Sequence, residues 1–201
     1  MKTKTGLLAA VIAGVTLLGV GESTIEPAEA AGSSARFYAI APESGALHEL
    51  AGATSLAKSI GAYGNNFCDP SDVPGNYQLK KYRTIAGSGY PAGNTNMRCG
   101  DQSYGWRHIK AAHQSQWERA ISIADDDWGD LADFAIGESL RAPWIAVTEP
   151  GGKTCYSTPI HIYSDPGNEL IVRFFVMTIV SQANRHVITA YPNSVENCHP
   201  V

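Results

Sequence analysis

The run Glu169-Leu-Ile-Val-Arg-Phe-Phe-Val-Met-Thr-Ile-Val180 is an almost continuous series of Ile, Val and Phe. A short apolar run of this kind, bounded by turn signals, predicts a central buried strand. Before it, Asp165-Pro166-Gly167-Asn168 is a turn signal that follows the alternating segment Thr154–Tyr163. After it, a turn at Asn184 leads into Arg185–Tyr191, which again has strand composition. These segments predict an antiparallel meander, to which Trp144–Thr148 adds a short strand.

Two helices are predicted upstream of this sheet. In Tyr104–Ala124, apolar residues and one histidine recur at steps of three and four along one stripe: Trp106, Ile109, His113, Trp117 and Ala120. Trp128–Leu140 predicts a second helix, and the acidic residues Asp125–Asp127 suit its N-terminus. The expected fold class is therefore α+β, with N-terminal helices packed on one face of a C-terminal antiparallel sheet of about four strands.

The first half of the chain has weaker patterns. Residues 31–45 are expected to be an exposed leader, and Ala46–Ile60 a short helix weakened by Gly52. Residues 61–98 show no sustained period apart from a strand candidate at Gln78–Ile85. We therefore expect an irregular region over 31–99 and a catalytic helix-plus-sheet region over 100–201, with 31–201 forming one domain.

Residues 1–30 have the composition of a signal peptide. A basic start with Lys2 and Lys4 precedes the apolar run Gly6–Val20, and Ala28-Glu29-Ala30 matches a small-x-small cleavage site. We expect cleavage after Ala30, a secreted extracellular protein, and no membrane anchor after signal removal. A retained anchor helix is the alternative.

All four cysteines, Cys68, Cys99, Cys155 and Cys198, follow this segment. An even count in an exported chain predicts two disulfides, and four cysteines allow three connectivities. We favour Cys68–Cys99 and Cys155–Cys198, because each pair would tie a loop or the C-terminal end to a neighbouring element. No Cys-x-x-Cys spacing supports a zinc site.

The formal net charge of −4 argues against a general nucleic-acid binder. Its distribution is uneven, however. Residues 80–119 carry seven Lys and Arg against two Asp and Glu, a balance of +5, whereas residues 120–150 carry one against seven, a balance of −6. This segregation predicts either a local positive field or two solvated faces of different sign.

Gly100–Arg119 holds the densest group of proton-transfer residues and fixed positive charges. His108 and His113 are five positions apart, which places them roughly 140° apart around a helix, so we expect no simple pair in one small site. His108 shares a stripe with Arg119 and is the first candidate for a general base. His113 lies on the apolar stripe, where a buried structural histidine is the alternative. On the last strand, Thr189 and Tyr191 share one face, which would meet a crossing helix.

The His-Ile-x-x-x-His arrangement of His108-Ile109 and His113, together with the terminal Thr-x-Tyr-Pro that contains Thr189 and Tyr191, resembles a known family. It is similar to the RNase A-like C-terminal toxin domains of bacterial contact-dependent inhibition systems. More broadly, it resembles the metal-independent ribonucleases grouped with barnase, EndoU, colicin nucleases and RelE. The resemblance covers about residues 100–192. The usual glycine-rich lead before the histidine is replaced here by Tyr-Gly-Trp-Arg, and no second well-placed strand lysine is evident.

The resemblance implies a secreted, toxin-like ribonuclease that uses no metal and no cofactor and leaves a 2′,3′-cyclic phosphate. It implies acid-base catalysis by His108 or His113, and phosphate contacts from Thr189 and Tyr191. Arg119 would stabilise charge on the phosphoryl oxygens. We expect Arg107, Lys110 and Arg185 to contact substrate. The expected partners are RNA and a neutralising protein, and we expect the chain itself to be a monomer.

The main alternative is a secreted, non-enzymatic binding or inhibitor protein that uses the Tyr- and Gly-rich loop from Tyr63 to Tyr90. Other enzyme classes have less support. Ser157, Thr158 and Glu138 lack the spacing of ADP-ribosyltransferases, and no Gly-x-Ser-x-Gly element supports Ser-His-Asp hydrolysis.

Overall fold

The apolar run of the sequence forms β7 (Leu170–Ser181), which is paired along both of its edges. We describe a computed structural model that covers residues 36–50, 67–69, 72–124, 127–165 and 167–198. Within residues 33–201, which form one compact unit, the strands of the large sheet follow the order β2-β1-β6-β7-β8, with β5 also paired to β6. Every strand pair in this sheet is antiparallel.

Strand β6 (Lys153–Asp165) organises the sheet because it is long enough for two partners on one edge. Its first half pairs with β5 (Ile145–Glu149), and its last residues pair with β1 (Arg36–Ala41). Pro159 stands between these two partners, where a residue without an N–H costs no ladder bond to either of them. Strand β2 (Ala46–Leu50) extends the sheet beyond β1, and β8 (Val187–Asn193) forms the other edge beyond β7.

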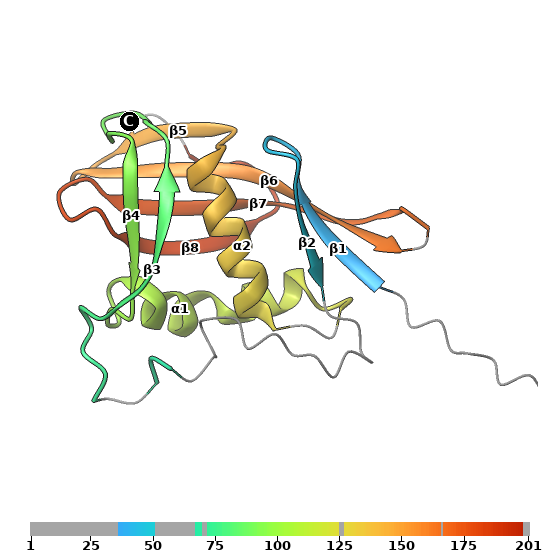
Figure 1. Ribbon diagram of the computed structural model, residues 1–201, viewed down its shortest axis with the longest axis horizontal. Helices are drawn as coiled ribbons and strands as arrows, with labels where there is room; N and C mark the ends of the chain where they lie inside the picture. Colours follow the sequence, from blue (N-terminus) through green and yellow to red (C-terminus); the bar gives the residue numbers. More distant parts are fainter. Residues whose placement is uncertain (1–35, 51–66, 70–71, 125–126, 166, 199–201) are drawn as a thin grey trace, which may run out of the picture. The chain divides into compact units, whose positions relative to one another are not determined.

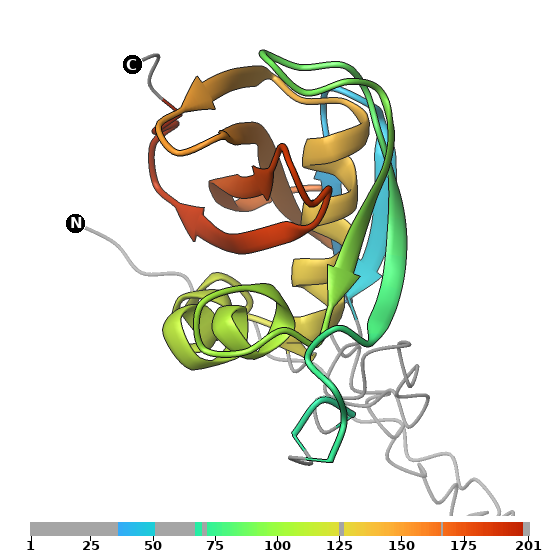
Figure 2. The ribbon, with the colours of Figure 1, turned by 90° about the vertical axis from the view of Figure 1, so that its left-hand side faces the viewer.

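A separate hairpin of β3 (Gln78–Thr84) and β4 (Gly93–Arg98) stands beside the large sheet (Figures 1 and 2). It meets the large sheet through a bridge between Asn96 and His186. A hydrogen bond between the amide of Ile85 and the carbonyl of Leu140, 3.0 Å long, joins the end of β3 to the end of α2.

Helix α2 (Trp128–Arg141) lies between the hairpin and the large sheet (Figures 1 and 2). Its apolar side chains are buried in the core: Leu131, Ala132, Ala135, Ile136 and Leu140. Asp127 caps the helix by accepting a hydrogen bond from the amide of Gly129 at 2.7 Å, which supports the interpretation of this aspartate as a helix-terminal residue. Asp125 and Asp126 lie outside the described residues.

Helix α1 (Gly105–Ala120) runs along β8, begins one residue after the predicted start at Tyr104 and ends four residues before the predicted end at Ala124. Its first turn is joined to the first turn of α2 by the stacked rings of Trp106 and Trp128, whose centroids are 5.0 Å apart. Trp106, Ile109 and Trp117 are buried, as the stripe predicted.

The predicted arrangement of N-terminal helices on a sheet of about four strands is wrong. The described residues form eight strands and two helices, and four of the strands precede α1 in the chain. Strand β1 lies in the expected leader, β2 in the first residues of the expected helix Ala46–Ile60, and β4 in the region expected to be irregular. These strands have five or six residues each, too few for a period to show, and β1 is specified by pairing with β6 far along the chain. The rest of the expected helix, like the expected signal peptide, lies outside the described residues.

Both favoured cysteine pairings are confirmed. Cys68 and Cys99 are bonded with their Cα atoms 5.4 Å apart, and Cys155 and Cys198 with theirs 5.7 Å apart. The second bond fastens the C-terminal segment to β6. In the part of the chain that the structure describes, neither helix is long and apolar enough to cross a membrane.

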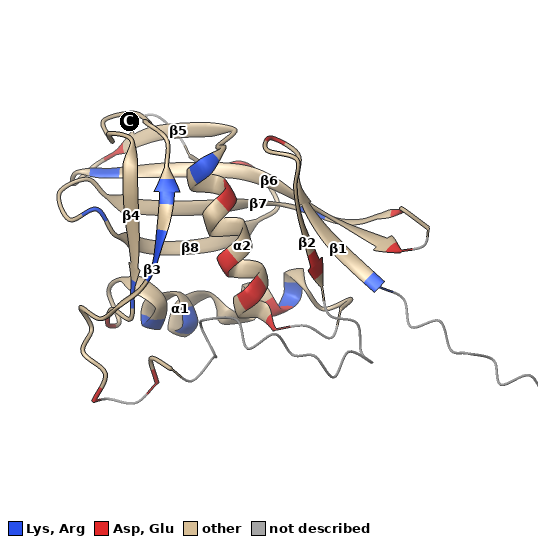
Figure 3. Cartoon of the chain, viewed as in Figure 1, with Lys and Arg blue, Asp and Glu red and all other residues tan. Residues whose placement is uncertain are grey.

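Basic and acidic residues that are separated in the sequence meet in the fold, where a basic residue of β3 contacts an acidic residue of α2. Basic residues lie on β3 and α1, and acidic residues along α2, which ends with the basic Arg141 (Figure 3). Lys80 on β3 donates to Asp133 on α2 at 2.5 Å, and the phenol of Tyr82 donates to the same carboxylate at 2.6 Å. Part of the expected positive field is therefore neutralised within the fold.

Candidate active site

The candidate site begins at a tight turn, residues 100–104, that leads into α1. Gly100 has φ +68°, and a Cβ there would lie 1.8 Å from the carbonyl oxygen of Tyr104. Gly105 has φ +78°, and a Cβ there would lie 2.7 Å from the carbonyl oxygen of Arg98. Both positions therefore require glycine. The amide of Asp101 donates to the carbonyl of Tyr104 at 3.0 Å and closes the turn.

His108 lies on the first full turn of α1 and is partly exposed. Its Nδ1 is 2.7 Å from the carbonyl oxygen of Gln102, within the 100–104 turn. Because a carbonyl oxygen only accepts, Nδ1 carries the proton in this hydrogen bond, and a neutral imidazole then has its lone pair on Nε2. The turn thus fixes the tautomer that a general base needs.

His113 lies between His108 and β8. Its ring stacks on the ring of Tyr191 with centroids 4.9 Å apart, and meets the ring of His108 edge-on at 5.6 Å. Its Nδ1 donates to Oε1 of Gln116 at 2.9 Å. Burial lowers the pKa of His113, the hydrogen bond that its ring donates to Gln116 opposes that change, and the charge of His108 adds to the lowering. His113 is therefore neutral at neutral pH.

The contact between the two histidine rings differs from the expectation that they face different sides. In an ideal helix their backbone positions are roughly 140° apart, but helical side chains lean toward the N-terminus. The ring of His113 therefore extends back over the turn that carries His108. We find one continuous row of rings: His108, His113 and Tyr191.

Thr189 and Tyr191 occupy the same face of β8, as predicted, opposite Ile179 and Met177 of β7. The hydroxyl of Thr189 is buried and has no hydrogen-bond partner among the residues that the structure describes. Burial raises the pKa of Tyr191, and the charge of Glu149 raises it further. Both side chains are thus uncharged hydroxyl donors.

Helix α1 is held on β8 by a buried indole. Nε1 of Trp117 donates to the carbonyl oxygen of Ala190 at 3.2 Å, and the indole ring meets Phe174 edge-on at 6.0 Å. Ala190 stands between Thr189 and Tyr191, so this bond sets the position of the helix relative to both hydroxyls.

Arg119 is not part of the row of rings. It is exposed on the last turn of α1, six residues after His113 and so about 9 Å farther along the helix axis. Arg119 was expected on the same stripe of the helix as His108, but the eleven positions between the two residues correspond to about three turns, so Arg119 lies far along the helix from His108.

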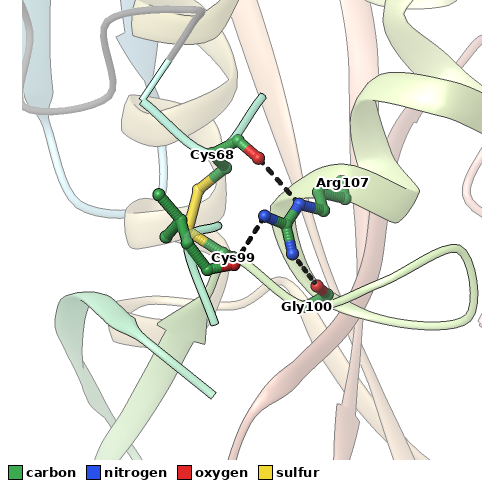
Figure 4. The surroundings of a disulfide bond; sticks show 5 residues. Cys68, Cys99, Gly100 and Arg107 are labelled. Atoms are coloured by element: carbon green, nitrogen blue, oxygen red, sulfur yellow. Dashed lines mark hydrogen bonds between the residues drawn. A yellow bond between two sulfur atoms is a disulfide. The ribbon is translucent and has the colours of Figure 1, made fainter. Parts of the chain in front are cut away.

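The three expected substrate-contacting residues have contacts within the protein. The guanidinium of Arg107 donates to the carbonyls of Cys68 at 2.7 Å, Gly100 at 2.9 Å and Val73 at 2.7 Å (Figure 4). Lys110 donates to Asp69 at 2.6 Å.

Arg185 similarly donates to backbone oxygens at the start of β4 and just before it. Its Nε is 3.1 Å from the carbonyl of Asn94, and its Nη2 is 3.3 Å from those of Pro91 and Ala92. The guanidinium also lies over the ring of Tyr90, 5.1 Å from the centroid. In the structure, Arg107 and Arg185 therefore hold segments of the protein's own backbone together.

Sequence reasoning missed a second histidine contact near the start of α1. His186, 8% exposed, packs against the ring of Tyr104 with centroids 4.7 Å apart. Burial lowers the pKa of His186, and the charge of Arg98 lowers it further. Its Nδ1 has no hydrogen-bond partner among the described residues. Nothing in the local sequence distinguishes this residue from an ordinary start of a strand.

Among the described residues, no group of three or more His, Cys, Asp and Glu side chains is arranged to hold a metal ion.

Comparisons with known proteins give relatives without a known function. The chain is 32% identical over 113 residues to two uncharacterized proteins of Mycobacterium tuberculosis, one from strain CDC 1551 / Oshkosh and one from strain ATCC 25618 / H37Rv. Each match covers 52% of this chain and 38% of the relative, so the chain spans well under two thirds of the relatives' length. No family model matches the chain, and no solved structure matches it.

Proposed function

We propose that this chain is an endoribonuclease that cleaves RNA by metal-independent transesterification, like the toxin domains it resembles. The observation that carries the proposal is the row of rings, in which a histidine with a fixed tautomer is joined through His113 to the phenol of Tyr191. The hydroxyl of Thr189, on the same face of β8, supports it, because no other described residue forms a hydrogen bond with it.

In this proposal, Nε2 of His108 removes the proton of the ribose 2′-hydroxyl. The 2′-oxygen then attacks the adjacent phosphorus, the bond from phosphorus to the 5′-oxygen breaks, and a 2′,3′-cyclic phosphate forms. Thr189 donates a hydrogen bond to a phosphoryl oxygen. Tyr191, whose raised pKa keeps its phenol protonated, transfers its proton to the 5′-oxygen, which leaves as a hydroxyl, and the phenolate then regains a proton from solvent. His113 is neutral and orients the phenol by stacking on it.

We propose roles for Arg119, Arg107 and Arg185 that differ from those expected from the sequence. Arg119, exposed at the end of α1, is proposed to contact the RNA backbone beyond the scissile bond. Arg107 and Arg185 hold the protein's own loops. We further propose export of the chain, which two disulfides support because they persist in oxidising compartments. RNA and a neutralising protein remain the proposed partners.

The test is cleavage of end-labelled RNA by the purified chain in the presence of a chelator, with detection of fragments that end in a cyclic phosphate. His108→Ala is expected to lower kcat by about 10²–10⁴-fold, the usual contribution of a positioned proton-transfer group. The matched control is His161→Gln, which changes a half-buried histidine on β6 and is expected to cleave like the unsubstituted chain. Full activity of a folded His108→Ala variant would refute the assignment of the base.

One observation favours the alternative of a non-enzymatic binding protein. Phe67 and Tyr77 are 44% and 47% exposed, and their rings contact each other at 5.1 Å beside the Cys68–Cys99 bond. An exposed aromatic pair held by a disulfide is a suitable protein-contact surface. Absence of RNA cleavage by the unsubstituted chain at every concentration would favour this function.

A further inference from the structure

We propose that Arg107 is a positioning residue, which, together with the Cys68–Cys99 disulfide, holds the 100–104 turn in the conformation that fixes the tautomer of His108. This role rests on the proposed function, because it concerns the residue assigned as the general base. It differs from the substrate contact that the sequence suggested for Arg107.

The first step of the argument is the number of bonds that Arg107 makes to backbone. Its three guanidinium nitrogens each donate to a different carbonyl, of Cys68, Gly100 and Val73. Its own amide donates to the carbonyl of Cys99 at 2.9 Å. One residue of α1 therefore joins the two cysteines, the first residue of the turn and a further loop (Figure 4).

The second step is the surroundings of the disulfide. Cys68 and Cys99 are 2% and 0% exposed. The amide of Cys99 donates to the carbonyl of Tyr77 at 3.0 Å, and the amide of Gly100 to that of Gly75 at 2.7 Å. The segment that accepts the bonds of Arg107 is thus itself fixed by a covalent bond and by backbone hydrogen bonds.

The third step leads from the turn to the imidazole. Gly100, which accepts from Arg107, is two residues before Gln102, whose carbonyl accepts from Nδ1 of His108. The turn between them is stiff, because the carboxylate of Asp101 accepts from both the amide of Ser103 at 2.7 Å and its hydroxyl at 2.6 Å. Movement of Gly100 would therefore displace the Gln102 carbonyl and release the ring of His108.

Lysine cannot replace arginine in this role. Its ammonium is a single charged point on a flexible stem, whereas three carbonyls in different directions require the planar fork of a guanidinium. Arg107→Lys therefore keeps the charge and removes the positioning.

The first measurement is the tautomer of His108 in the full, nitrogen-15-labelled chain, read from long-range proton–nitrogen NMR spectra. The unsubstituted chain is expected to show the proton on Nδ1 of His108. In Arg107→Lys, and in the paired variant Cys68→Ser and Cys99→Ser, this signal is expected to be replaced by that of a mixture of tautomers. The control is Arg185→Lys, since Arg185 also donates to three backbone carbonyls but of another segment, and here the Nδ1–H signal of His108 is expected to persist.

The second measurement separates positioning from substrate binding in the cleavage assay. Arg107→Lys is expected to lower kcat by roughly 10²-fold, while KM changes by less than about twofold, because an interaction with bound substrate is not being removed. A raised KM at constant kcat would instead identify Arg107 as a phosphate contact and overturn the proposal.

Two further outcomes would also overturn it. One is a folded Arg107→Lys variant in which the NMR signals of His108 are unchanged. The other is an Arg107→Lys variant that circular dichroism shows to be unfolded, since a residue required by the whole fold has no separate positioning role. The NMR result does not depend on any RNA, so a change of tautomer in a chain that cleaves no RNA would refute the ribonuclease proposal alone.

Discussion

His113 links the chemistry of the candidate site to the pH dependence of folding. Burial lowers the pKa of His113 below its ordinary value of 6.5. Between the folded pKa and 6.5, the unfolded chain binds more protons than the folded chain, so the free energy of unfolding falls as the pH decreases through this range. The stability that the neutral ring contributes is complete above 6.5 and is lost below the folded pKa.

We therefore predict that His113→Phe, which keeps an aromatic ring against Tyr191 but cannot be protonated, loses less stability on acidification than the unsubstituted chain. The measurement is the free energy of unfolding in urea at a series of pH values between about 7.5 and 5, a range centred on the ordinary histidine pKa. His161 and His186, whose pKa values are also lowered by burial, contribute to both proteins, so the difference between the two curves reports His113 together with its electrostatic interaction with His108. Parallel curves would contradict the prediction.

At the scale of elements, the site depends on the packing of α1 along β8. Trp117 is fully buried and is the indole that donates to Ala190. Trp117→Phe would leave the Ala190 carbonyl without its partner and open a cavity at the edge of the ring. We predict a loss of about 2–4 kcal/mol in the free energy of unfolding, from the unpaired acceptor and the lost packing together.

The same substitution is expected to slow RNA cleavage, because β8 carries Thr189 and Tyr191 on either side of Ala190. Urea unfolding and the cleavage assay measure the two effects. The matched control is Trp144→Phe, since the Trp144 side chain is 63% exposed and its replacement is expected to change stability by no more than about 0.5 kcal/mol. Equal stability of Trp117→Phe and Trp144→Phe would show that the indole does not fasten the helix.

The elements that could be predicted from the sequence are those whose pattern is local. Both helices are predictable because tryptophans and other apolar residues repeat at helical spacing over about four turns, although α1 ends four residues before its predicted end. Strands β6 and β7 were found because each is long and they meet at a turn signal. Strand β4, Gly-Asn-Thr-Asn-Met-Arg, has a poor strand composition and is a strand because it pairs with β3.

The sequence predicts which residues of the candidate site share a face of an element, but it does not predict most of the contacts between those residues. Periodicity placed Thr189 and Tyr191 on one face of β8, and the structure has them there. It could not show that His113 reaches from α1 to stack on Tyr191, since this depends on how the side chains lean. Nor could it show that Arg107 and Arg185 are bound to backbone carbonyls, because such bonds join segments that are distant in sequence.

At the scale of the whole molecule, the two disulfides close loops of similar length but at different places. Cys68 and Cys99 are 31 residues apart, and Cys155 and Cys198 are 43 apart. If each bond acts by restricting the unfolded chain, its removal costs about 3–4 kcal/mol, and the two losses should be nearly equal because the entropy depends on the logarithm of loop length.

We predict from this that the paired variants Cys68→Ser with Cys99→Ser, and Cys155→Ser with Cys198→Ser, unfold in urea with similarly reduced free energies. Their effects on the site are expected to differ. The first bond is joined to the 100–104 turn through Arg107, whereas the second joins β6 to the C-terminal segment. Only the first pair should therefore change the tautomer of His108. If both variants change it equally, general loosening of the fold, and not the contact through Arg107, controls the imidazole.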